Sequence, residues 1–410
     1  MDRAAPPVAT PSVDHTVLNL RVVTPIPLSP VSWGNGVMKD ICLVEMETMD
    51  GIRGLGSAYT SAARFRQAWE MLQPDVDGQP LDPEAVSAGL WQKYGDLIRA
   101  DDDFLGPALS AIDIALWDIL GKKLGRSVAE LLGGRRFDRV LAYASLEIPL
   151  PERIPDQAFA ARIERMKALG FRAIKLYLPG FGYRDAGRST ADWDQYEASV
   201  LAYARKVAGR GVLLMLDAWA AAPDWPNGAE WALKTAKVLA RYGYEWFEEP
   251  LPPAERETYA WLRRNTEIAV TGCEGLTGVP AFTPWIRDHA VDIVQPDITR
   301  AGGLSVLRQI RAGARFYNGH VIPHGWNTAV GLAADLAFLA SQVSDRRPLV
   351  EFMPSAHLLD PLLGQPFRLK DGTIRVPGGP GLGITLNRSL LQRGRGVFAV
   401  PEGGPHPTKP

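Results

Sequence analysis

Beyond residue 138 the chain carries eight short apolar runs, spaced so that a helix fits between most successive runs. The runs are VLAYAS, AIKLYL, GVLLMLDA, YEWFEEP, IAVTGCE, DIVQPDI, HVIPHGW and LVEFM. One intervening segment, DQAFAARIERMKALG, places Phe159, Ile163 and Met166 on one helical face and ends at Gly170. Strands that alternate with helices pair in parallel, and eight such units are what a (β/α)8-type barrel requires. A doubly wound open sheet is the structural alternative, disfavoured because no glycine-rich phosphate turn follows an early strand.

The remaining segments predict a smaller α+β domain beside the barrel. TVLNLRVV and DICLVEMET read as strands, and the Pro- and Gly-rich segment between them, TPIPLSPVSWGNGVMKD, reads as a long loop. Leu109, Ile112, Leu116 and Ile119 form one apolar helical stripe. We therefore predict an α+β domain over residues 16–138, a barrel domain over 139–370, a segment 371–392 that returns to complete the first domain, and mobile tails at 1–15 and 393–410.

Composition narrows the classes of partner and compartment. The 410 residues carry 45 Lys and Arg against 46 Asp and Glu, a net charge of -1, which gives no electrostatic footprint for nucleic acid or an anionic membrane. Cys42 and Cys273 are too few for a disulfide framework or a zinc cage. The start of the chain has no signal-peptide core, and no run approaches a membrane span. These features predict a cytoplasmic protein that acts on a small neutral or acidic molecule.

Acidic residues and one histidine end the later strands of the predicted barrel. They are Asp217, Glu248 with Glu249, Glu274, Asp297, His324 and Glu351. Catalytic residues of such barrels lie at these carboxyl ends, so the side chains should converge on one mouth. Three carboxylates from adjacent strands would repel one another unless a hard divalent cation neutralises them, and this predicts Asp217, Glu248 and Glu274 as ligands of Mg²⁺. Glu249 points to the other side of its strand, where a salt bridge behind the lining and a direct role are both open.

Two further pairs of residues are candidates for chemistry. Asp297 and His324 end neighbouring strands, and their pairing favours a dyad in which the carboxylate holds the imidazole tautomer and raises its basicity. The structural alternatives are that Asp297 caps a helix and that His324 is an ordinary turn residue. Lys175 and Tyr177 lie two residues apart in the second run, so both side chains point to the same face of a buried strand.

The motifs DAW, FEEPLPP, GCE, QPDITRAGG and IPHG follow SAIDIALWDILGKKLG in this order and spacing. Together they resemble the enolase superfamily, in its mandelate racemase subgroup, over residues 16 to 390. LMLDAW, EEPLPP and GLGITLNR are most similar to acid-sugar dehydratases of the rhamnonate dehydratase kind. The resemblance implies an N-terminal capping domain that closes over the barrel mouth, Mg²⁺ on the three predicted ligands, and an Asp297–His324 general base. It also implies that Glu351 hydrogen-bonds a substrate carboxylate oxygen, and that the protein is a homo-oligomer.

The shared reaction of that superfamily explains a lysine inside the barrel. Removal of a proton α to a carboxylate creates an enediolate, whose charge Lys175 and Glu351 would bind together with Mg²⁺. Many members of the subgroup carry a second lysine as a base where this chain has Tyr177, and a tyrosine is a poor base at neutral pH. We therefore expect dehydration of an aldonic or aldaric acid to a 2-keto-3-deoxy acid, with His324 as the single base.

Other interpretations remain at the level of sequence. Tyr177 is either an acid or base on the opposite face or only a substrate contact. A racemase or epimerase with opposed bases is one alternative, and a non-catalytic barrel that binds sugar acids is another. In the first domain, Trp33, Asn35, Met38 and Tyr59 are candidates to contact the substrate's distal hydroxyls. Trp219 and Trp326 follow site residues and either wall the pocket or fill the core.

Overall fold

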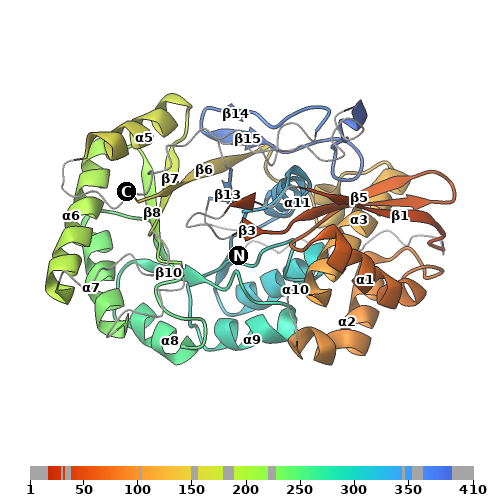
Figure 1. The fold of residues 1–410 in the computed structure, drawn as a ribbon, viewed down its shortest axis with the longest axis horizontal. Helices are drawn as coiled ribbons and strands as arrows, with labels where there is room; N and C mark the ends of the chain where they lie inside the picture. The colour runs from red at the N-terminus through yellow and green to blue at the C-terminus, as the bar shows by residue number, and fades with distance from the viewer. Residues whose placement is uncertain are drawn as a thin grey trace, which may run out of the picture.

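The eight apolar runs form eight strands of a parallel barrel, seen in the computed structural model of Figure 1. The strands are β6 (Arg139–Glu147), β7 (Ala173–Tyr177), β8 (Leu213–Asp217), β9 (Trp246–Glu248), β10 (Ala269–Gly272), β11 (Ile293–Val294), β12 (His320–Val321) and β13 (Leu349–Glu351). From β6 to β12 they pair in parallel in chain order, and β13 pairs in parallel with β6, so the eighth strand returns to the first. The predicted fold class is confirmed.

The structure describes most of the chain but leaves several segments undescribed. The described residues are 17–28, 31–32, 38–100, 104–148, 156–178, 189–219, 228–343, 347–352 and 363–389. The predicted tails, 1–15 and 393–410, lie outside them.

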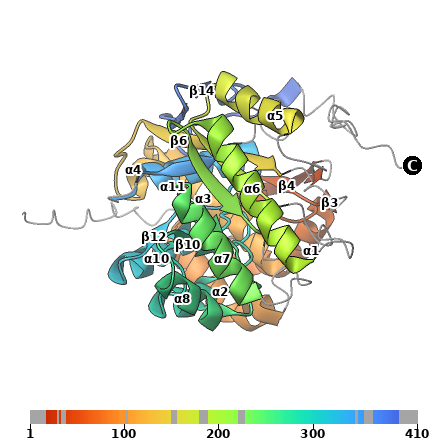
Figure 2. The ribbon, with the colours of Figure 1, turned by 90° about the vertical axis from the view of Figure 1, so that its left-hand side faces the viewer.

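Helices follow the barrel strands and cover the outside of the barrel (Figure 2). They are α5 (Gln157–Ala168), α6 (Thr190–Ala208), α7 (Gly228–Arg241), α8 (Arg256–Arg264), α9 (Val279–Arg287), α10 (Gly303–Phe316) and α11 (Ala329–Ala340). In α5 the predicted face of Phe159, Ile163 and Met166 is buried, and the Asp156 side chain caps the helix by accepting the Phe159 N–H at 2.8 Å.

No helix within the described segments is long and apolar enough to cross a membrane.

The interior of the barrel is filled by side chains that alternate along each strand. One buried apolar cluster lies toward the amino-terminal ends of the barrel strands and contains Tyr143, Met215, Trp246 and Ile293. Tyr143 and Trp246 meet edge to face, with ring centroids 5.6 Å apart. Polar side chains replace apolar ones only as the strands approach their carboxyl ends, and this places the chemistry at one mouth.

The N-terminal domain is a three-stranded antiparallel sheet covered by helices. Its strands, in the order β1-β4-β5, are β1 (Leu20–Pro27), β4 (Cys42–Thr48) and β5 (Arg53–Ala58). Its helices are α1 (Ala62–Leu72), the 3₁₀ helix η1 (Gln73–Asp75), α2 (Pro83–Ala100), α3 (Leu105–Leu124) and α4 (Val128–Leu131), and a short ladder joins β2 (Val31–Ser32) to β3 (Met38–Lys39). The predicted stripe lies on α3, which is buried on every side over most of its length.

The expectation of an irregular loop from residue 24 was wrong at its start. Pro25 and Pro27 belong to β1, where they pair with Val44 and Cys42 of β4. A proline cannot donate a ladder hydrogen bond, but β1 is the edge strand of its sheet, so one side of it needs no donors.

Two glycines let β5 lie directly on α3. A Cβ atom at Gly54 would lie 2.3 Å from the Ala115 carbonyl oxygen, and one at Gly56 would lie 2.0 Å from that of Ala111. Only glycine permits this contact between backbones, which fixes the sheet of the N-terminal domain against the helix that also packs on α10.

The C-terminal segment joins both domains. The strands β14 (Leu369–Lys370) and β15 (Thr373–Arg375) form a hairpin, and β15 pairs antiparallel with the first barrel strand, β6. The chain then reaches the N-terminal domain, where Arg388 Nη1 lies 3.0 Å from Glu45 Oε1. Within the described residues, residues 381–388 thus contact the first domain, whereas β15 extends the barrel sheet.

Candidate active site

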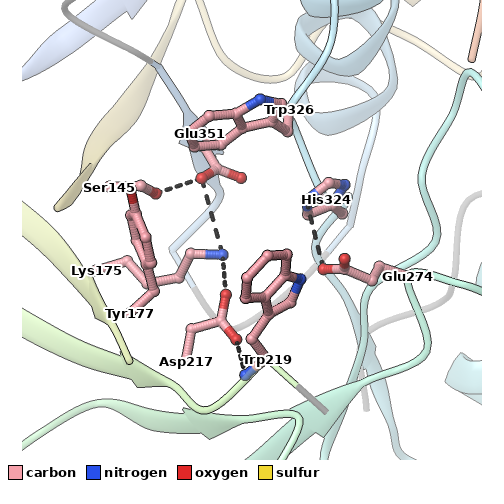
Figure 3. A pocket seen from close by; sticks show the side chains of 9 residues that line it. All are labelled: Ser145, Lys175, Tyr177, Asp217, Trp219, Glu274, His324, Trp326 and Glu351. Atoms are coloured by element: carbon pink, nitrogen blue, oxygen red, sulfur yellow. Dashed lines mark hydrogen bonds and ion pairs between the residues drawn. The ribbon is translucent and has the colours of Figure 1, made fainter. Parts of the chain in front are cut away.

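A pocket lies at the carboxyl ends of the barrel strands (Figure 3). Its described lining consists of Ser145, Lys175, Tyr177, Asp217, Trp219, Glu274, His324, Trp326 and Glu351. All but Ser145 are residues that the sequence singles out for the site or for its wall, although they come from strands spread over 200 residues of chain. Ser145, at the end of β6, is an addition, because a serine inside an apolar run carries no distinctive signal.

Lys175 lies at the centre of a group of carboxylates that we call the mouth cluster, defined as Lys175, Asp217, Glu248, Glu274 and Glu351. Its side chain is buried, and Nζ donates to Glu248 Oε1 at 2.7 Å. Nζ also lies 3.0 Å from Asp217 Oδ2 and 3.8 Å from Glu351 Oε1. Burial alone would lower the pKa of Lys175, but the carboxylates outweigh it and hold that pKa well above its usual value. The lysine is therefore charged.

The acids of the mouth cluster outnumber its cations. Burial, together with the charges of Glu248 and Glu274, raises the pKa of Asp217 to about 7 despite Lys175. Burial and the nearby Glu248 also raise the pKa of Glu274. Oxygen donors crowded in this way at a buried site suit a hard divalent cation, which would relieve both the burial and the repulsion.

The predicted metal ligands fit such an ion by chemistry but are not gathered around one point. Asp217 and Glu248 both face Lys175, whereas Glu274 Oε2 lies 3.4 Å from His324 Nε2. Within the described segments, no three His, Cys, Asp or Glu side chains are arranged to hold a metal ion as they stand. Each acid instead pairs with a cationic side chain. A metal ion would have to displace those pairings, so the assignment of the three ligands stays a prediction.

His324 and Asp297 are hydrogen-bonded as the sequence predicts. Nδ1 of His324 lies 2.8 Å from Asp297 Oδ2, and both side chains are buried. The other carboxylate oxygen, Asp297 Oδ1, accepts from the backbone N–H of Thr299 at 2.7 Å and from its hydroxyl at 2.6 Å. Burial alone would lower the pKa of His324, but Glu274 and Asp297 raise it well above the ordinary range. The dyad is thus fixed on its Nδ1 side and presents Nε2 to the pocket.

Glu351 is held from three sides at the end of β13. Its carboxylate accepts from the Ser145 hydroxyl, from the Gly325 backbone N–H at 3.2 Å and from the Tyr143 hydroxyl at 3.4 Å. Burial raises the pKa of Glu351, but Lys175 and His324 outweigh burial and the net pKa is lowered. Glu351 is therefore an anion with a fixed orientation, whose partners Ser145 and Tyr143 look like ordinary core residues in the sequence.

Aromatic rings form one wall of the pocket. Tyr177 and Trp326 meet edge to face with centroids 6.4 Å apart, and Trp219 lies beside Asp217. Burial, followed by the charge of Glu147, raises the pKa of Tyr177 above its already high usual value. Tyr177 is therefore a neutral phenol, which can donate a hydrogen bond but is a poor base.

Backbone geometry turns the chain sharply at the predicted metal ligands. Trp219, Glu249 and Cys273 have φ values of 53°, 42° and 86°, in the left-handed region that side chains other than glycine rarely adopt. Each lies within two residues of Asp217, Glu248 or Glu274. Backbone strain of this kind concentrates at functional sites, because the surrounding structure must hold it in place.

Glu249 is a second buried acid behind the lining. Its Cγ atom packs against Gly272, 3.5 Å from the position that a Cβ atom would take at that glycine. No salt bridge to Glu249 is found among the described residues. Burial, then Glu274 and Asp217, raise the pKa of Glu249 well above its usual value. Within the described segments, the salt bridge that the sequence left open is not formed.

The predicted substrate contacts from the N-terminal domain are not in the described pocket. Tyr59 is 6% exposed, packs with Ile41, and donates its backbone N–H to the Thr299 carbonyl at 3.2 Å. It therefore fills the junction between the domains, the commoner fate of a buried aromatic ring. Trp33 and Asn35 lie outside the described residues, as does the side chain of Met38.

Family models match both parts of the chain. The mandelate racemase / muconate lactonizing enzyme N-terminal domain matches residues 16–133, and the enolase C-terminal domain-like model matches residues 158–390. The chain belongs to the mandelate racemase and muconate lactonizing enzyme family of the enolase superfamily. The N-terminal domain described above is thus the capping domain of this family, and the barrel is its C-terminal domain.

Relatives in this family are named as enzymes of sugar acids. A D-galactarolactone cycloisomerase from Agrobacterium fabrum is 32% identical over 85% of this chain and 89% of its own length. A D-gluconate dehydratase from Thermoproteus tenax is 29% identical over 86% of this chain and 69% of its own length. The solved structure of a 3,6-anhydro-D-galactonate cycloisomerase from Zobellia galactanivorans is 27% identical, with a TM-score of 0.77 over 92% of this chain and 99% of that one.

Proposed function

We propose that this member of the enolase superfamily is a hydro-lyase that converts an aldonic or aldaric acid into a 2-keto-3-deoxy acid. The proposal is carried by the asymmetry of the pocket. A histidine hydrogen-bonded to a carboxylate lies on one side, and a neutral phenol, Tyr177, takes the place of a second base. Dehydration needs one base that can also act as an acid, whereas two-base racemisation needs a base on each face.

Asp217, Glu248 and Glu274 would hold Mg²⁺, the metal that their oxygen donors and the charge excess of the mouth cluster favour. When bound, such an ion supplies Lewis acidity toward a carboxylate oxygen of the substrate. The donor chemistry described above supports this choice, as does the absence of histidine and cysteine among the three predicted ligands.

The chain's own residues account for the proton movements. In the neutral form of His324, Nε2 takes the α-proton, and the electrons of the C–H bond form the C=C bond of an enediolate whose charge lies near Lys175. This step requires that Glu274, whose charge raises the pKa of His324, be neutralised first. The enediolate electrons then expel the β-hydroxyl, which takes a proton from the His324 imidazolium and leaves as water. The enol that remains tautomerises to the 2-keto acid. Glu351, already fixed by three donors, would have to take up a proton before it could donate a hydrogen bond to a carboxylate oxygen of the substrate.

Cycloisomerisation is a second candidate, favoured by the names of two of the relatives. If the β-oxygen that departs belongs to a ring of the same molecule, the same steps open the ring and release no water. Epimerisation would instead require Tyr177 to act as a base on the opposite face. A barrel that binds sugar acids without turnover is the remaining interpretation.

A substrate screen tests these candidates directly. Purified protein with Mg²⁺ is incubated with mono- and diacid sugars and their lactones and anhydro forms, and 2-keto products are detected with semicarbazide. NMR in D₂O follows proton exchange and counts the atoms lost. A keto product with loss of water supports the proposal, and one without loss of water indicates cycloisomerisation. Exchange with inverted configuration and no keto product indicates epimerisation, and binding without any of these contradicts catalysis.

Metal binding has its own test that does not need a substrate. Calorimetry of the wild-type protein with Mg²⁺ should show one site, and Mg²⁺ at 100 times Kd should stabilise the protein by about 2.7 kcal/mol. Glu274→Gln should weaken both effects, whereas Glu245→Gln, outside the pocket lining, should change neither. Equal binding by Glu274→Gln would contradict the ligand assignment. Homo-oligomerisation is also proposed from the family resemblance, and light scattering with a mass above one chain would support it.

A further inference from the structure

One acidic residue interrupts the apolar helix that follows the pocket histidine. Every residue of α11 is buried, and Asp335 is its one charged residue, with 1% of its surface exposed. A buried carboxylate needs a cation or several donors. No salt bridge to Asp335 is found within the described segments. The mechanism proposed above makes no use of this group.

The partner of Asp335 comes from the loop that carries the catalytic histidine. Asn327 Nδ2 donates to Asp335 Oδ2 at 3.2 Å, and both side chains are buried. The other oxygen of each side chain, Oδ1 in both cases, is buried with no hydrogen-bond partner among the described residues. Two buried acceptors without donors are costly, by about 1–3 kcal/mol each. A single proton on Asp335 would turn one of these acceptors into a donor for the other.

The electrostatic surroundings favour that proton. The charged groups that face Asp335 are Asp297, His324 and Glu351. Burial, and then the charge of Asp297, raise the pKa of Asp335 well above its usual value, against smaller lowering effects from Asn327 and His324. No lysine or arginine is among the largest contributions to this balance.

We propose that Asp335 is a neutral carboxylic acid that forms a two-hydrogen-bond pair with the carboxamide of Asn327. In this pair Nδ2–H of Asn327 donates to one carboxyl oxygen, and the carboxyl O–H donates to Asn327 Oδ1. The pair positions the loop from His324 to Thr328, which also carries Trp326 of the pocket wall. Asp335 and Asn327 are positioning residues, since neither lines the pocket.

Close packing connects this pair to both members of the dyad. A Cβ atom at Gly331 of α11 would lie 2.6 Å from Asn327 Cγ and 2.9 Å from Thr299 Cγ2. Thr299 gives two hydrogen bonds to Asp297, and Asn327 follows His324 by three residues. The Asn327 backbone N–H also donates to the Gly325 carbonyl at 2.9 Å, which closes the loop on itself. A displacement of Asn327 would therefore reach His324 and Asp297 together.

Infrared spectroscopy tests the protonation state on the protein alone. The wild-type spectrum at pH 7, minus that of Asp335→Asn, should contain the carbonyl band of one protonated carboxylic acid. Asp335→Asn keeps the shape and replaces the O–H donor by N–H, so it should fold with an almost unchanged Tm. Lack of the protonated band overturns the neutral state of Asp335. If Asp335→Asn does not fold, the spectrum of Asp335→Leu is subtracted instead, because the wild-type spectrum alone also contains the bands of other protonated acids.

A residue swap tests the pairing. Asn327→Asp alone places two carboxyl groups together and should lower Tm by several degrees. The double variant Asn327→Asp with Asp335→Asn restores one acid and one amide, and should recover the wild-type Tm. A double variant no more stable than Asn327→Asp overturns the pair.

Kinetics test the positioning role, and this arm rests on the proposed function. Asp335→Leu should lower kcat by about 10- to 100-fold, the range found for residues that orient catalytic groups. KM should change by less than about threefold, because the substrate contacts remain. Asp335→Asn should keep wild-type kcat, as rescue by the conservative variant. Gly331→Ala should mimic Asp335→Leu, while Gly313→Ala of α10, with only one side-chain atom within 4.0 Å, should not.

Two outcomes separate this inference from the function itself. A loss that appears only in KM, or that Asp335→Asn shares with Asp335→Leu, overturns the positioning role. Failure of the wild-type protein to turn over any sugar acid contradicts the proposed function alone, because the infrared band and the Tm of the swap are measured without substrate.

Discussion

Buried carboxyl groups occur both at the barrel mouth and on helix α3, but they have different partners. On α3, Asp118 accepts the backbone N–H groups of Leu55 at 2.9 Å and Leu382 at 2.8 Å, together with the side chain of Lys122. In the mouth cluster, three of the acids, Asp217, Glu248 and Glu351, share the single ammonium group of Lys175, and Glu274 faces His324. The Asp118 carboxylate thus links the capping sheet, helix α3 and the C-terminal segment, whereas the acids of the mouth cluster mainly neutralise a cationic side chain.

This difference separates a structural acid from one available for a ligand. Backbone donors cannot move without unfolding the segments that carry them, so removal of Asp118 would leave buried N–H groups without acceptors. A lysine that faces several carboxylates can exchange one of them for a ligand at little cost in fold. Burial by itself does not distinguish the two groups, because Asp217, Glu248 and Glu351 of the mouth are as deeply buried as Asp118, or nearly so.

The largest effect should come from the pocket histidine. His324→Asn should lower kcat by about 10³-fold, in the range of general acid–base catalysis, because the base is lost. Its Tm should change by no more than a few degrees. The rate of keto-acid formation measures kcat, and thermal unfolding measures Tm. His289→Asn, at a histidine outside the pocket, is the matched control and should keep full activity. Full turnover by His324→Asn would mean that the base has been misassigned.

Asp118→Ala should have the opposite effects, a loss of stability without a loss of activity. Loss of the shared carboxylate should reduce the free energy of unfolding by roughly 3 kcal/mol, while kcat per folded molecule stays near the wild-type value. Urea unfolding would measure the free energy of unfolding, and active-site titration would give kcat per folded molecule. Asp96→Ala, at a carboxylate 94% exposed, should change stability by less than about 0.5 kcal/mol. Loss of kcat without loss of stability would remove the distinction between the two regions.

Asp113, the other acid of α3, should make stability depend on pH. It accepts the backbone N–H of Ser305 at 3.0 Å, and burial raises its pKa from 3.8 to about 7. Well below pH 3.8 the group is protonated in both the folded and the unfolded state. As the pH rises toward 7 the unfolded chain loses this proton first, so the group's contribution to stability falls.

Asp113→Asn should remove that dependence. The stability of the variant relative to wild type should rise between pH 5 and pH 8 by roughly 2–3 kcal/mol, in favour of the variant. Urea unfolding at both pH values would measure the change. An unchanged difference between variant and wild type would show that Asp113 keeps an ordinary pKa.

The smallest effect is expected at Tyr177. If His324 is the single base, Tyr177→Phe should lower kcat by less than about tenfold, and the facial outcome in D₂O should not change. Tyr94→Phe in the capping domain serves as the control. A loss near that of His324→Asn would instead make Tyr177 an acid or base on the opposite face, and would favour epimerisation.

The sequence predicts the barrel and its mouth well because both depend on local patterns. Each strand lies in a mainly apolar run of five to eight residues, most of which carry a polar group toward the end, and parallel pairing brings these ends together. Lys175 and His324 stand out because a charged or titratable side chain inside an apolar run has few structural reasons to be there.

Residues that act through distant partners could not be predicted in this way. Ser145 and Tyr143 orient Glu351 but resemble core residues in their own strand. Asp113 and Asp118 lie on an apolar helix, and their backbone partners are 192 and 264 residues further along the chain. Proline content misled the reading of β1, since an edge strand tolerates what a central strand does not.

The path of the C-terminal segment has a consequence for synthesis. Residues 381–388, which complete the capping domain, leave the ribosome after every strand of the barrel, and Glu45 meets Arg388 across 343 residues of chain. The capping domain of a nascent chain therefore remains incomplete until translation is nearly finished, because Asp118 still lacks one of its hydrogen-bond donors. Any premature stop beyond the barrel should release a chain whose first-made domain is the one left unfinished.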